Sequence, residues 1–189
     1  MSSHSLTQEQ AQHYETEGYV VVESIFSRDE LSALDDTIRD LTREAVESGE
    51  PEKIMEVEPE KLDGETIPRR IYNPFEQHES FRKLATDDRI LDRIEALIGP
   101  DIGLHHSKLN MKPAKVGSVV EWHQDLSYYP MTNRDSLAVL FYLDDTDATN
   151  GPLKLIPKRH EAPLMQHTRE GFFQGRVTEP VDESDVVMA

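Results

Sequence analysis

Two side chains that could bind a metal stand two residues apart in the segment 121–130, which reads EWHQDLSYYP. In an extended strand, residues i and i+2 project from the same face, so His123 and Asp125 would present an imidazole and a carboxylate side by side. Two histidines and one carboxylate on one face of an octahedral ion leave the opposite face open, an arrangement typical of non-haem Fe(II) oxygenases. The pair therefore supplies two of the three ligands of such a triad.

A histidine two residues before an acidic residue is a weak signal alone, because the chain has 37 acidic residues and eight histidines. The pattern recurs at His13 and Glu15, in a segment of helical character, where we interpret it as surface. Two alternatives to an iron site stay open. The chain could be a non-catalytic binding module in which His123 and Asp125 form a polar pair. It could also be a zinc hydrolase, although no general-base glutamate stands at the spacing of a His-Glu-x-x-His motif.

The composition limits the class of protein. The chain has 189 residues, of which 37% are hydrophobic, and this is enough for a single domain over 1–189 with a sizeable core. The formal net charge of −17 argues against binding to a phosphate backbone, so nucleic acid is not an expected partner. There is no cysteine, and no window approaches the ~20 apolar residues of a membrane span. We expect a cytoplasmic protein without a membrane span.

Helices are predicted in the first half of the chain. Two capping boxes, in which a Thr or Ser is followed three residues later by a Gln or Glu, predict helix starts after Thr7 and Ser27. Further helices are expected over 79–85 and in a segment that ends at Gly99. The acidic stretch 44–66 shows no sustained period, and we interpret it as a surface excursion within the domain.

From Asp101 onward the sequence changes to short apolar runs separated by turn residues. Such runs predict consecutive strands, and helices followed by strands suggest a sheet or barrel with the helices packed on its outside. The predicted strands span 102–111, 116–123, 137–143, 153–156, 172–177 and 186–188, with an earlier one over 19–22.

Several blocks resemble the phytanoyl-CoA dioxygenase family in order and spacing. They read KLNMKP at 108–113, WHQDLSYYP at 122–130, LDD at 143–145, NGPL at 150–153 and IP at 156–157. EGYVV at 17–21 and LIGPD at 97–101 also look like this family, so the resemblance covers nearly the whole chain. It implies an α+β fold on a double-stranded β-helix, a jelly-roll or cupin-like barrel with N-terminal helices packed outside.

The resemblance implies an Fe(II)- and 2-oxoglutarate-dependent dioxygenase. His123 and Asp125 match the first two iron ligands of the family, and 2-oxoglutarate and O2 would take the open positions. Decarboxylation of 2-oxoglutarate to succinate and CO2 would accompany hydroxylation of a C–H bond in a small-molecule substrate. Retention of Asp125 favours hydroxylation, because related halogenases have a small residue at that position. The substrate and the oligomeric state are not readable from the sequence.

Four further residues match positions that lie near 2-oxoglutarate in the family. Arg70 corresponds to a basic residue that approaches the co-substrate, and Tyr142 to an aromatic residue that contacts it. The alternatives are a surface role for Arg70 and core packing for Tyr142. The position of Gln124 also lies near the co-substrate, which would require a local turn to break the strand alternation. Lys108 matches another pocket-lining position, where a strand lysine with its ammonium in solvent is an equal alternative.

The distal part of the family pattern is not found. Family members supply a second histidine on a later strand and, further along, an arginine, but only His160 and His167 follow His123. His160 stands where the family has a loop histidine, which favours a structural role. His167 and Arg176 imitate the missing pair, although the stretch around His167 resembles the variable segment before the distal strands. We therefore expect a partial domain that lacks its C-terminal barrel strands, binds iron and co-substrate weakly and could be an inactive fragment.

Overall fold

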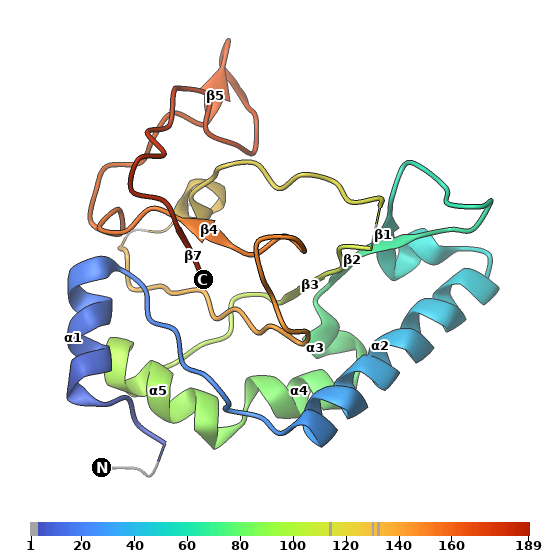
Figure 1. The fold of residues 1–189 in the computed structure, drawn as a ribbon, viewed down its shortest axis with the longest axis horizontal. Helices are drawn as coiled ribbons and strands as arrows, with labels where there is room; N and C mark the ends of the chain where they lie inside the picture. Colours follow the sequence, from blue (N-terminus) through green and yellow to red (C-terminus); the bar gives the residue numbers. More distant parts are fainter. Residues whose placement is uncertain (1–3, 114, 130, 132) are drawn as a thin grey trace. The chain divides into compact units, whose positions relative to one another are not determined.

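A computed structural model describes residues 4–113, 115–129, 131 and 133–189 (Figure 1). Pro130, part of the family-like block at 122–130, lies outside the described residues. The chain divides into two compact units. Unit 1 comprises Met1–Leu6, Val22–Ser118 and Phe141–Gly151, and unit 2 comprises Thr7–Val21, Val119–Leu140 and Pro152–Ala189.

The longest helix of unit 1, α2 (Arg28–Glu47), begins at the predicted capping box. The Ser27 hydroxyl accepts a hydrogen bond from the Glu30 amide, and the Glu30 carboxylate accepts one from the Ser27 amide. Leu34 and Ile38 lie on one stripe of α2 and pack against Phe81 in a buried cluster. The remaining helices of unit 1 are α3 (Pro74–Gln77), α4 (Glu79–Ala85) and α5 (Asp88–Ile98). The predictions of a helix over 79–85 and of a helix that ends at Gly99 are confirmed.

Unit 1 also contains an antiparallel sheet in the order β1 (Met55–Val57), β2 (Pro68–Tyr72) and β3 (Lys108–Asn110). The register places Met55, Ile71 and Leu109 side by side across the three strands. Ile71 is fully buried, and its cluster includes Met55 and Ala45 of α2. Because side chains alternate along a strand, the residues on either side of Ile71 project from the opposite, polar face of the sheet.

The acidic stretch 44–66 is more ordered than the surface excursion that we predict. It contains the end of α2, a short 3₁₀ helix η1 (Pro51–Lys53) and strand β1. Ala45 and Met55 are buried, and so is Glu58, whose carboxylate accepts hydrogen bonds from the Ser118 hydroxyl at 2.5 Å and amide at 3.2 Å. These bonds lower the pKa of Glu58. A three-residue strand is too short to produce the periodic pattern on which a sequence prediction depends.

Unit 2 begins with α1 (Gln8–Glu17), which also starts at its predicted capping box. The helix ends at Gly18, whose φ of 84° lies in the left-handed region that favours glycine. The ring of His160 occupies the space beside Gly18, since a Cβ there would lie 2.3 Å from the imidazole Nδ1. The other ring nitrogen of His160 lies 3.1 Å from the Glu15 carbonyl oxygen. His160 therefore has a structural role, as the sequence suggests.

Two short antiparallel pairs complete unit 2. β4 (Lys154–Leu155) pairs with β7 (Val187–Met188), and β5 (Thr168–Arg169) pairs with β6 (Phe172–Phe173). A 3₁₀ helix, η2 (Asp125–Tyr128), follows His123 closely in the chain.

The described strands form one three-stranded sheet and two short pairs, and not the larger sheet or partial barrel that the sequence suggests. Among the described residues, 19–22, 116–123 and 137–143 belong to no strand. Several of their apolar side chains are exposed, including Val119 at 76% and Leu140 at 53%. An apolar run predicts burial, but a strand forms only where a second strand pairs with it, and the sequence does not show that partner. Within the described part, no helix has both the length and the apolar character needed to cross a bilayer.

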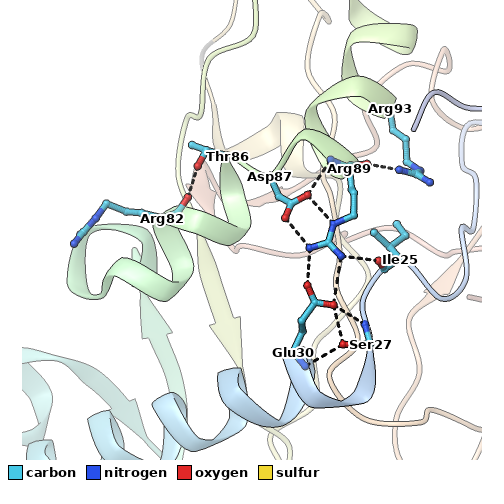
Figure 2. A network of polar contacts seen from close by, with 8 residues as sticks. All are labelled: Ile25, Ser27, Glu30, Arg82, Thr86, Asp87, Arg89 and Arg93. Carbon is cyan, nitrogen blue, oxygen red and sulfur yellow. Dashed lines mark hydrogen bonds and ion pairs between the residues drawn. The ribbon is translucent and has the colours of Figure 1, made fainter. Parts of the chain in front are cut away.

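A charged network joins the starts of α2 and α5 (Figure 2). The Arg89 guanidinium lies between two carboxylates, with Nη2 at 2.7 Å from Glu30 Oε1 and at 2.8 Å from Asp87 Oδ2. It also donates to the Ile25 carbonyl at 3.2 Å and lies 4.3 Å from the centre of the Phe26 ring. Hydrogen bonds from Arg89 and Ser27 lower the pKa of Glu30 to about 2, and Arg89 also lowers the pKa of Asp87.

We expect Ile71→Ala to lower the free energy of unfolding by about 2–5 kcal/mol, because it removes a fully buried side chain and leaves a cavity. Urea denaturation followed by circular dichroism measures the change. Leu104→Ala is the control, since Leu104 is 53% exposed in the same unit and its truncation should cost less than about 0.5 kcal/mol. Equal losses for the two variants would contradict the assignment of the core.

The Arg89 network should give a stability that depends on pH. The folded-state pKa values of Glu30 and Asp87 are depressed, so their stabilisation is present above their ordinary values near 4 and is lost as the pH falls through the folded pKa, about 2 for Glu30. The difference in melting temperature between the wild type and Arg89→Met should therefore shrink below about pH 4. Arg28→Met is the control, because the Arg28 pair with Asp145 is almost fully exposed. A difference that is constant with pH would contradict this account.

Candidate metal site

The ring of His123 is oriented by the backbone of its own segment. Its Nδ1 lies 2.8 Å from the carbonyl oxygen of Glu121. A carbonyl oxygen only accepts hydrogen bonds, so Nδ1 carries the proton, and Nε2 of the neutral ring keeps its lone pair. Nε2 lies 3.4 Å from Asp125 Oδ1. The structure therefore brings together the two side chains that the sequence predicts as metal ligands.

The local backbone explains why these two groups meet. Gln124 is extended, with φ of −121° and ψ of 122°, so the residues before and after it project to the same side. The 3₁₀ helix η2 then begins at Asp125 and turns the chain. The side-chain alternation is kept at Gln124, so the turn that we predict would break it there is not present; the chain turns only from Asp125 onward.

The donor set fits a divalent metal ion such as Fe(II). Two donors that are each about 2.1 Å from one ion and at right angles to each other lie about 3 Å apart, close to the observed 3.4 Å between Nε2 and Oδ1. Metal-binding histidines usually donate their second ring N–H to a carbonyl or carboxylate, as His123 does to Glu121. No group of three or more potential metal ligands occurs within the residues that the structure describes. The pair is thus the candidate centre.

The segment 165–178 forms hydrogen bonds with the segment 121–128 on both sides of His123. The amide of Val177 donates to the Trp122 carbonyl at 2.7 Å, just before His123. The amide of Gln124, just after His123, donates to Nε2 of His167 at 3.1 Å. The backbone is therefore held on both sides of the candidate ligand.

Gln124 and His167 are also linked through Met165, with which both side chains form hydrogen bonds. The Oε1 of Gln124 accepts a hydrogen bond of 2.7 Å from the Met165 amide, and Nδ1 of His167 lies 2.8 Å from the Met165 carbonyl. The side-chain oxygen of Gln124 thus contacts the segment 165–178. Both ring nitrogens of His167 are engaged by backbone groups, and Arg176 lies 3.4 Å from a carboxylate oxygen of Glu121. These contacts favour structural roles for His167 and Arg176. They do not favour the roles of the second histidine and the arginine that family members supply further along the chain.

Aromatic side chains continue from the candidate site along the segment 165–178. The Tyr128 ring lies edge-on to the rings of His123 at 5.9 Å and Phe173 at 5.0 Å. The Tyr128 hydroxyl donates to the carbonyl of Gly175. The sequence gives no signal for these contacts, because the two segments lie about 40 positions apart and neither has a regular period.

The other predicted site residues, Arg70, Lys108 and Tyr142, lie in unit 1. Arg70 Nε donates to the Asn110 side chain at 2.9 Å, and Nη1 lies 3.2 Å from Glu56 Oε2. Lys108 is exposed on β3, and Tyr142 is 39% exposed outside the described strands. Arg70 thus contacts neighbours on both adjacent strands of the sheet.

Comparison with known proteins shows what most of the chain is similar to. The family model described as "Phytanoyl-CoA dioxygenase (PhyH)" matches residues 14–184. A "Probable alpha-ketoglutarate-dependent hypophosphite dioxygenase" from Stutzerimonas stutzeri is 32% identical over 161 residues, which cover 84% of this chain and 55% of that protein. An "Ectoine dioxygenase" from Bordetella bronchiseptica is 29% identical over 160 residues, which cover 82% of this chain and 50% of the relative.

Solved structures agree with the sequence comparisons. A crystal structure of EctD from S. alaskensis with bound Fe matches with a TM-score of 0.55 and 27% sequence identity. The match covers 67% of this chain and 43% of that one. The chain spans about half the length of the curated relatives that it matches. The fold of the chain therefore resembles part of EctD.

We expect Gly175→Ala to destabilise unit 2 more than Gly171→Ala. Both glycines have positive φ, 64° and 83°, so a methyl group should cost about 1–2 kcal/mol of backbone strain at either position. Only at Gly175 would the added Cβ also press on the Tyr128 hydroxyl, at 3.2 Å, whereas nothing lies within 4 Å at Gly171. Thermal unfolding of the two variants compares the losses. Equal losses would show that the Tyr128 hydroxyl accommodates the added methyl group without a further cost.

Proposed function

Because the chain belongs to the phytanoyl-CoA dioxygenase family, we propose that it supplies iron ligands for the activity of an Fe(II)- and 2-oxoglutarate-dependent dioxygenase. The reaction is hydroxylation of a C–H bond in a small-molecule substrate, with O2 as oxidant and with release of succinate and CO2. The observation that carries the proposal is the pair of His123 and Asp125, 3.4 Å apart, with Nδ1 of the imidazole against a carbonyl oxygen and Nε2 facing the carboxylate.

His123 and Asp125 have complementary tasks in this proposal. Nε2 of His123 and the carboxylate of Asp125 hold Fe(II), and the carbonyl of Glu121 keeps the imidazole in the correct orientation. When bound, iron together with 2-oxoglutarate and O2 supplies the oxidising chemistry. The protein's own task is to place these donors and to position one C–H bond of the substrate. The anionic carboxylate also offsets part of the charge of the ion.

The polar face of the sheet in unit 1 supports a role in binding the co-substrate. Arg70 and Tyr72 on β2 lie opposite Asn110 and Lys108 on β3, so all four side chains project from the face that Ile71 does not occupy. This face carries two cations, which suit the two carboxylates of 2-oxoglutarate. Arg70 donates to the Tyr72 hydroxyl at 3.0 Å, which orients the guanidinium. The anionic co-substrate would replace the carboxylate of Glu56 as the partner of Arg70.

Tyr142 and Gln124 complete the residues that we assign to the co-substrate. Tyr142 would contribute an aromatic wall. Gln124 would act through the NH2 of its side-chain amide, since the Oε1 of that amide already accepts a hydrogen bond from the Met165 backbone amide. The relatives are named for substrates as different as hypophosphite and ectoine, so the family does not transfer a substrate to this chain.

An anaerobic Fe(II) titration tests the proposal. We expect His123→Ala and Asp125→Asn to weaken Fe(II) binding by more than the ~10–100-fold that changes around a metal site typically cause, because each removes a ligand. The matched control is His13→Ala, which removes the histidine of the similar pair on α1, and it should bind as the wild type does. Succinate formation that depends on 2-oxoglutarate is the second measurement.

Two results would count against the proposal. Binding that is unchanged in both ligand variants would place the metal elsewhere. A folded wild-type chain that binds neither Fe(II) nor 2-oxoglutarate would favour the alternative, a non-catalytic binding module in which His123 and Asp125 are only a polar pair.

A further inference from the structure

His167 is a buried histidine, with 4% of its surface exposed. A buried imidazole is costly unless both of its nitrogens form hydrogen bonds. Nδ1 lies 2.8 Å from the Met165 carbonyl, which only accepts, so Nδ1 carries the proton. Nε2 is then an acceptor, and it receives the Gln124 amide at 3.1 Å. The ring is therefore neutral, with one tautomer set by its surroundings.

The ring is also held in place by packing. The Phe173 ring lies nearly parallel to it, with centroids 6.4 Å apart and planes at 19°. The His167 carbonyl accepts a hydrogen bond of 2.8 Å from the Gln174 amide, just after the β5–β6 hairpin. The acceptor for Gln124 is thus fixed by neighbours that belong to the same segment, 165–178.

We propose that His167 is a positioning residue for the metal pair, because it accepts a hydrogen bond from the backbone amide of Gln124, the residue between His123 and Asp125. The inference rests on the proposed function. It gives a role to a residue that is not a ligand. It also includes a second hydrogen bond near the pair, from the Met165 amide to Gln124 Oε1. Together these two hydrogen bonds form a latch, defined as Gln124, Met165 and His167.

The latch matters because the relative position of the two donor groups depends on the backbone conformation of a single residue. His123 and Asp125 are separated only by Gln124, so its φ and ψ set the direction of both side chains. The Val177 amide holds the backbone before His123, whereas the latch holds it after His123. Without the latch, Gln124 can leave the extended conformation, and the two donors then point to different sides.

The experiment compares three substitutions of histidine in unit 2. His167→Phe keeps a ring beside Phe173 but removes both nitrogens, and His167→Gln returns an acceptor at a reach similar to that of Nε2. His160→Phe is the matched control, because His160 contacts the Glu15 carbonyl and Gly18 instead of the latch. Thermal unfolding first shows which variants are folded. His167→Leu, which also removes both ring nitrogens and keeps an apolar side chain beside Phe173, is the second variant if His167→Phe does not fold.

Two quantities are measured on each folded variant. The first is hydrogen exchange of the Gln124 amide in the metal-free chain, which should be about 10-fold faster in His167→Phe than in the wild type. The second is the anaerobic affinity for Fe(II) alone, which should fall by about 10-fold or more. His167→Gln should recover most of both. His160→Phe can lower the melting temperature but should leave both quantities unchanged.

The outcomes separate this inference from the proposed function. If the wild type binds Fe(II), His123→Ala does not, and folded His167→Phe binds as the wild type does, the inference is overturned and the proposed function stands. If His167→Leu is needed and it binds as the wild type does, the inference is overturned in the same way. If the wild type itself binds no Fe(II), His123→Ala and His167→Phe give the same result as the wild type. The proposed function then fails together with the inference.

Discussion

Two hydrogen bonds that engage the backbone, one on each side of His123, are the constraint on which the candidate site depends. Trp122 accepts from the Val177 amide, and the Gln124 amide donates to His167. Each such bond contributes only about 0.5–1.5 kcal/mol to stability, which is small beside the burial of the hydrophobic core. Their importance lies in direction. They keep the backbone at Gln124 extended, and an extended residue places its two neighbours on the same side.

The same arrangement explains how the chain prepares the imidazole for a metal. The Glu121 carbonyl accepts a hydrogen bond from Nδ1 of His123, so Nε2 is the nitrogen that faces Asp125. His167 uses the same chemistry for another purpose, because its Nε2 lone pair receives a backbone amide. Two histidines in one unit, each with Nδ1 against a carbonyl oxygen, therefore differ in what their second nitrogen faces. That difference separates a candidate ligand from a residue that holds the backbone.

Local features of this fold could be predicted from the sequence, and long-range features could not. The capping boxes after Thr7 and Ser27 place the starts of α1 and α2, because a cap is formed by residues three positions apart. The spacing of His123 and Asp125 predicts their proximity for the same reason. Strand β1 and the contacts of His167 depend on partners far along the chain, and apolar runs such as the one at 137–143 do not reveal whether a partner strand is present.

The family relationship and the local geometry support each other at the metal pair. The chain matches about half the length of its curated relatives, and the family model covers residues 14–184, which include His123 and Asp125. The most direct test of the account is a crystal structure of the chain exposed to Fe(II) without oxygen, with anomalous diffraction measured at the iron edge. The account predicts one strong anomalous peak within bonding distance of His123 Nε2 and an Asp125 oxygen, and none at His167. A peak at other residues, or none while the metal remains bound in solution, would contradict it.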